Sequence, residues 1–164
     1  MRRLTAARPV ALAVAALACT LAGLAGLAWR WDGSAPGAGS PVPASAISRL
    51  TMLASRAAKA NGDADPEWMT AVLTTHAKAL TSATPGDIVP GSGEVRVYLV
   101  TMRGRFIAYE SSPPPGAALP TGTYLSLVVD AGTFRVLDFG LSPTPPPVSP
   151  ASLGPVTYLT GRGP

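Results

Sequence analysis

The stretch "LVVDAGTFRVLDFG", residues 127–140, decides how the second half of the chain folds. Apolar and polar residues alternate on both sides of "DAGT", which is typical of two strands with one buried face. Asp130 begins the turn, where its carboxylate can accept backbone N–H groups, and Gly132 is expected to take the strained backbone position. The stretch therefore predicts an antiparallel hairpin. Asp138 has no structural role that the pattern explains.

The core of this hairpin is expected to come from alternate residues of both strands. The first strand would contribute residues 125, 127 and 129 to one face of the sheet. Val136 or Leu137, together with Phe139, would continue that core from the second strand. Because successive strand side chains point to opposite faces, these residues define which side of the sheet is buried.

Other segments extend the hairpin into a sheet. "EVRVYLVTM" (94–102) alternates, and "RFIAYE" (105–110) follows after Arg103-Gly104, where glycine suits a short hairpin turn. A proline-rich loop then separates them from the strand that enters the opening stretch. "LGPVTYL" (153–159) is expected to form a short edge segment or to pack beneath the sheet. These patterns predict a four-stranded antiparallel meander.

Two segments before the sheet carry apolar residues at helical spacing. In the first, about 45–60, Ser45 is the expected N-cap. In the second, about 66–81, Asp65 is the expected N-cap, and the apolar stripe consists of Met69, Val72, Leu73, His76 and Leu80. Two helices before a meander predict an α+β domain in which the helices pack on the sheet.

The N-terminal segment is expected to target the chain to the membrane. Residues 1–9 are basic, and residues 10–29 form 20 residues without a charge. A helix of that length spans about 30 Å, the hydrocarbon thickness of a bilayer. We rank a single-pass transmembrane helix with a cytoplasmic N-terminus first, a cleaved signal and secretion second, and lipidation at Cys19 third.

The remaining chain divides by composition. Residues 30–44 are a Gly/Pro/Ser tether, 45–142 form the extracytoplasmic α+β domain, and 143–164 are a proline-rich C-terminal strap.

Residues 1–33 hold four of the 13 basic residues and one of the nine acidic residues, so the rest of the chain is nearly neutral. Because nucleic-acid binding needs a basic patch on the folded part, we expect no nucleic-acid partner.

Residues for catalysis are scarce. With one histidine and one cysteine, a zinc site or an internal disulfide is not expected. His76 would have to serve any Ser-His-Asp arrangement, and Glu110 with Asp138 is the carboxylate pair that a hydrolase would use. The stronger interpretation is a packing histidine and solvated acids. We therefore assign no catalytic, cofactor-binding or metal-binding residue.

The hairpin resembles the end of PepSY-type repeats, in which a "VDA-x-TG-x-V" motif closes a small unit of a helix and a meander. The expected Thr-Gly is here Thr133-Phe134. The whole chain also resembles a group of uncharacterised actinobacterial envelope proteins with a short apolar N-terminus, "TTHAKAL", "VVDA…DFGL" and a closing "LGPVTYL". These resemblances imply a cystatin/PepSY-like fold and an exported, non-catalytic domain. PepSY-type modules are thought to bind or inhibit partners such as peptidases.

The leading functional hypothesis is a membrane-tethered extracytoplasmic module that binds or regulates a protein partner in the cell envelope. An assembly subunit of an envelope or secretion complex is the alternative, with the apolar span providing much of the contact. A small hydrolase using His76, or Glu110 with Asp138, is the third hypothesis.

Overall fold

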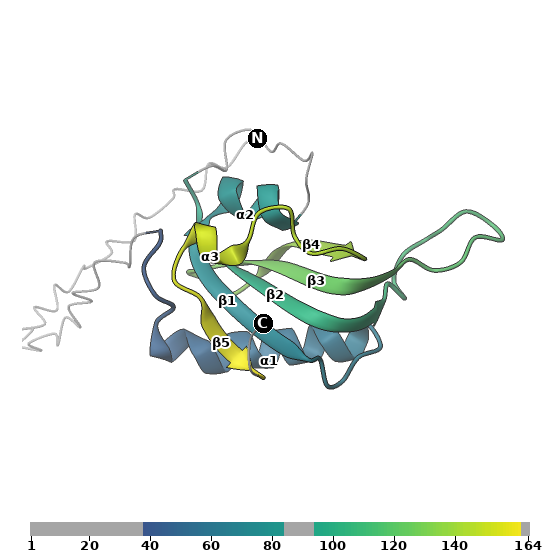
Figure 1. The fold of residues 1–164 in the computed structure, drawn as a ribbon, viewed down its shortest axis with the longest axis horizontal. Coiled ribbons are helices and arrows are strands. Elements are labelled where there is room, and N and C mark those ends of the chain that lie inside the picture. The colour runs from purple at the N-terminus through teal and green to yellow at the C-terminus, as the bar shows by residue number, and fades with distance from the viewer. Residues whose placement is uncertain (1–37, 84–93, 162–164) are drawn as a thin grey trace, which may run out of the picture. The chain divides into compact units, whose positions relative to one another are not determined.

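The computed structural model describes residues 38–83 and 94–161 (Figure 1). The chain divides into two units, Met1–Asp32 and Gly33–Pro164, and the described residues all belong to the second. The expected transmembrane segment 10–29, with Cys19, lies outside the described residues. Among the helices of the described ranges, none has the length and apolar character needed to cross a membrane.

Five antiparallel strands form the sheet, in the spatial order β4-β3-β2-β1-β5 (Figure 1). The strands are β1 (Trp68–Thr75), β2 (Arg96–Ile107), β3 (Thr121–Asp130), β4 (Val136–Ser142) and β5 (Thr157–Thr160). The expected α+β class is confirmed, because helices pack on an antiparallel sheet, but the strands differ from the predicted four: two predicted strands form the single β2, and β1 was expected to be helical. The predicted edge segment is present, since β5 returns to pair with the outer side of β1.

The helix α1 (Ala44–Ala60) confirms the first predicted helix and lies across one face of the sheet. Its buried residues are mostly small and recur every four positions, so the helix packs closely on the strands. They are Ala46, Leu50, Ala54 and Ala58. The predicted N-cap was wrong: Pro43 occupies that position, and its carbonyl accepts the N–H of Ala46 at 2.9 Å. The neighbouring Val42 is buried in the core and fixes where the chain enters the helix.

The opposite face of the sheet is covered by α2 (His76–Ala83) and the short α3 (Pro150–Leu153), as Figure 1 shows. A smaller apolar cluster lies under them, formed by Val72, Ala79, Val97, Leu99 and Val128. Each face of the sheet therefore has its own core, and the strand side chains alternate between the two.

The second predicted helix, 66–81, was wrong in its first half. That half forms β1, and α2 begins only at His76. Six consecutive β1 residues are buried because the strand lies between β2 and β5 and has a core on each face. A strand buried on both faces has no alternation to show, so its apolar residues fit a helical pattern equally well. Asp65 caps no helix; its N–H donates to Asp63 Oδ1 at 3.1 Å.

The predicted hairpin at Arg103-Gly104 was also wrong, because β2 continues through it as one 12-residue strand. The pairing of β2 with β3 shifts register between Arg103 and Phe106, which marks a bulge. A Cβ atom at Gly104 would come 2.3 Å from Asp63 Oδ2, an oxygen that accepts the N–H of Arg105 at 2.7 Å. This glycine serves close packing at a bulge and not a turn.

The opening hairpin is confirmed as β3 and β4, and Asp130 closes its turn as expected. Its Oδ1 accepts the N–H of Gly132 at 3.1 Å, and the N–H and hydroxyl of Thr133 at 2.7 Å each. These bonds stabilise the charged carboxylate. The hydroxyl and N–H of Thr133 therefore lower the pKa of Asp130 below its ordinary value.

The strained position of this turn was assigned to the wrong residue. Phe134, with φ of 61°, takes the left-handed conformation, and Gly132 does not. The Phe134 ring stacks on Tyr98 with centroids 5.7 Å apart, and the Arg49 guanidinium carbon lies 4.2 Å from its centroid. Ring packing thus holds a non-glycine residue in the left-handed backbone conformation.

Candidate functional site

The face of the sheet that carries α1 is covered unevenly. The helix lies mainly over β5, β1 and β2, which leaves the β4 edge beside it. A groove of about 530 Å³ runs between the C-terminal end of α1 and β4. We call it the α1–β4 groove. It is lined by Ala57, Ala60, Asn61, Ala108, Glu110, Ser111, Leu127, Val136 and Phe139.

The β4 side of this region is apolar and open to solvent. Val136, Leu137 and Phe139 have 48%, 45% and 43% of their surfaces exposed. The expectation that they continue the core was therefore wrong, although Leu125, Leu127 and Val129 do share the α1 face as predicted. Val136, Leu137 and Phe139 have the composition and alternation of core residues. Only the position of α1 shows that nothing in the described chain covers them.

This strand is also an edge of the sheet. Within the described ranges β4 pairs with β3 alone, so its outer backbone N–H and C=O groups have no strand partner. Exposed apolar side chains rimmed by polar groups such as Glu110 and Asn61 are typical of protein interaction sites. An unpaired strand beside them offers backbone hydrogen bonds to an extended partner.

The two residues that the sequence could not assign, His76 and Asp138, are brought together. His76 Nε2 lies 2.6 Å from Asp138 Oδ2, across 62 residues of sequence. His76 is 6% exposed at the first position of α2, and its backbone N–H donates to the carbonyl of Val95 at 2.8 Å. The pair joins α2 to β4, which gives Asp138 a structural role.

The geometry does not extend this pair to a Ser-His-Asp arrangement. Such a triad needs the second ring nitrogen of the histidine to face a hydroxyl. His76 Nδ1 is buried and has no hydrogen-bond partner in the described residues. Glu110 and Asp138 do not meet either. Glu110 lines the groove on the α1 face, whereas Asp138 lies opposite Val128, whose side chain belongs to the core under α2.

Clusters of three or more His, Cys, Asp or Glu side chains suited to a metal ion are not found in the part of the chain that the structure describes.

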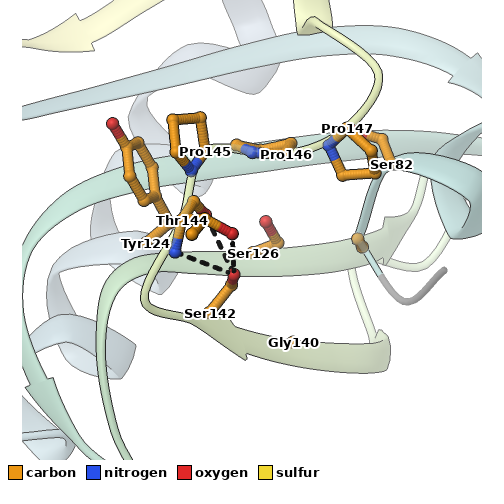
Figure 2. A pocket seen from close by; sticks show the side chains of 10 residues that line it. Ser82, Tyr124, Ser126, Gly140, Ser142, Thr144, Pro145, Pro146 and Pro147 are labelled. Atoms are coloured by element: carbon orange, nitrogen blue, oxygen red, sulfur yellow. Dashed lines mark hydrogen bonds between the residues drawn. The ribbon is translucent and has the colours of Figure 1, made fainter.

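A smaller pocket of about 220 Å³ lies on the opposite face, beneath residues 144–147 of the strap (Figure 2). Hydroxyl groups line it, and several of them hold the strap in place. Ser82 donates to the carbonyl of Val148 at 2.8 Å, and the Ser142 hydroxyl donates to the Thr144 carbonyl at 2.9 Å. These bonds explain the Ser82 and Ser142 hydroxyls as anchors for the proline-rich segment.

No protein-family model, curated protein or solved structure matches this chain. The candidate site therefore rests on its own geometry, in which the exposed β4 edge and the α1–β4 groove are the features that core packing does not explain.

Proposed function

We propose that the chain is a membrane-tethered extracytoplasmic module that binds or regulates a protein partner through the α1–β4 groove and the adjacent β4 edge. The membrane anchor is the apolar segment 10–29, followed by the tether 30–44, as the sequence predicts. The observation that carries the proposal is the half-exposed apolar surface of β4 at an unpaired sheet edge. The proposal assigns no catalytic residue.

Covering this surface would release apolar area from water. Fully burying a Val, Leu or Phe side chain stabilises by about 1.5–3 kcal/mol, so covering the exposed halves of Val136, Leu137 and Phe139 contributes about 2–4 kcal/mol before the costs of association. Hydrogen bonds to the β4 edge would set the direction of a bound strand. This combination favours an extended protein segment over a small polar ligand.

The test places a photo-crosslinking amino acid at Phe139 in the full-length chain, in the cells that make it. The matched control carries the same group at Met52, which is 51% exposed on the outward side of α1. We expect a discrete crosslinked protein from position 139 and none from position 52. Equal adducts from both positions, or none from either, would contradict the proposal.

A further inference from the structure

We infer that the partner seated on the β4 edge is a second copy of this chain, with the two β4 strands paired antiparallel about a two-fold axis at Phe139. This inference rests on the proposed function, because it names the partner of the same surface. The two sheets would then join into one continuous sheet across the two-fold axis.

The β4 sequence is self-complementary in this register. With Phe139 opposite itself, Asp138 faces Gly140 and Leu137 faces Leu141. Aromatic and aliphatic pairs directly opposite one another stabilise antiparallel strands, whereas like charges opposite one another destabilise them. Moving the axis by one residue to Asp138 would place two carboxylates face to face. The charge pattern therefore selects a register centred on Phe139 over one centred on Asp138.

The side chains that this pairing brings together already lie on defined faces of the sheet. Asp138 is turned toward α2 by its contact with His76, and Phe139 is turned toward the α1–β4 groove. The bulge of β4 lies before Asp138, where the pairing with β3 shifts between Val128 and Val129. The strand from Asp138 to Ser142 is regular, so the central pairs formed by residues 138–140 have an undistorted backbone, and the outer Leu137–Leu141 pairs lie at the bulge.

The other edge of the sheet is less suited to this role. The strand β5 has four residues, against seven in β4, and offers fewer backbone groups to a partner. Even at β4 a single pair of short strands makes a small interface, of the class under about 1,200 Å² that forms transiently. A shared membrane tether would compensate by raising the effective concentration of the two copies.

The first test is a disulfide scan in membranes, in a Cys19→Ser background. Directly opposed residues of antiparallel strands have Cα atoms about 4.5–5.5 Å apart. That distance lies within the range of about 4.4–6.8 Å that a disulfide spans. We expect Phe139→Cys to form a covalent dimer under mild oxidation. The control variants Met52→Cys and Tyr158→Cys, exposed on the outer side of α1 and on β5, should stay monomeric.

The second test exploits the two-fold axis, because residue 139 would face itself. Two differently tagged full-length copies are expressed together, and their co-purification is measured. If both carry Phe139→Asp, co-purification should fall about tenfold or more, since two opposed acids replace two packed rings. A mixture of Phe139→Asp and Phe139→Lys copies should regain it. The same charges at Met52 should change nothing.

The outcomes separate this inference from the proposed function. No disulfide at position 139, a disulfide of equal yield at the controls, or an unchanged co-purification of Phe139→Asp copies would overturn the self-pairing. If the photo-crosslinker at position 139 then captures a different protein, the proposed function stands and only the identity of the partner is wrong. If it captures nothing, both fail.

Discussion

Replacing Phe134 by glycine and, separately, by alanine is expected to separate the backbone strain of the β3–β4 turn from the packing that maintains it. Both variants lose the stacking on Tyr98 and the contact with Arg49. The lost apolar burial, ring stacking and cation–π contact together contribute about 2–4 kcal/mol for a partly buried ring. Both variants should therefore be less stable than the native chain.

The two variants differ in the backbone. Alanine at φ of 61° keeps the left-handed strain of about 1–2 kcal/mol, and glycine removes it. Glycine also adds about 0.5–1 kcal/mol of conformational entropy to the unfolded chain, which offsets part of the gain. We expect Phe134→Gly to be more stable than Phe134→Ala by about 0.5–1 kcal/mol, the difference between these terms.

The assay is urea-induced unfolding of the purified chain. The free energies of unfolding of the two variants are compared on the condition that both depend on urea concentration with the same slope. The urea dependence must be equal because a change in it would mean that the substitution had altered the compactness of the unfolded or native state, or had broken two-state unfolding. If Phe134→Ala proved as stable as Phe134→Gly, or more stable, the argument that ring packing holds a strained backbone would be refuted. A native-like stability for either variant would show that the ring contacts contribute little.

Three further predictions follow from single contacts. Asp130→Asn should make stability fall less steeply as the pH is lowered. Folding lowers the pKa of the Asp130 carboxyl, so its stabilising contribution is present above the unfolded pKa and is lost as the pH falls through the folded pKa. A series of melting temperatures measured at different pH values detects this. Gly104→Ala should destabilise by about 1–3 kcal/mol in urea unfolding, because its Cβ would stand 2.3 Å from a carboxylate oxygen, whereas Gly132→Ala, with its nearest contact at 3.5 Å, should stay within about 0.5 kcal/mol. A double-mutant cycle of His76→Ala and Asp138→Ala should give a coupling of about 1–3 kcal/mol, and additive effects would contradict the bond between them.

The elements that the sequence predicted correctly carry a local signal. The helix α1 has one buried face and so a helical apolar period, and the hairpin of β3 and β4 is marked by its turn residues, although β3 itself is buried on both faces. The strand β1 was missed because neighbours surround it on both faces and both edges, so its apolar residues carry no period of two. Gly104 was misread for a related reason: a glycine required by close packing has the same sequence signature as one required by a turn.

The candidate site was predictable only in its parts. His76 and Asp138 each stood out, as a histidine on an apolar stripe and an acid without a role, but nothing local pairs residues 62 positions apart. The α1–β4 groove could not be predicted from the sequence for a different reason. Val136 and Phe139 have the composition of core residues, and their exposure depends on where a distant helix ends its contact with the sheet.

The contact between His76 and Asp138 also bears on the proposed surface. Side chains alternate along β4, so a slip of one residue would exchange every side chain between the two faces. Such a slip would place Asp138 in the apolar groove and Phe139 against His76. Because the hydrogen bond holds Asp138 on the α2 side, it also holds Phe139 on the groove side. A pair that first suggests catalysis is thus better understood as fixing the register of the strand that presents the interaction surface.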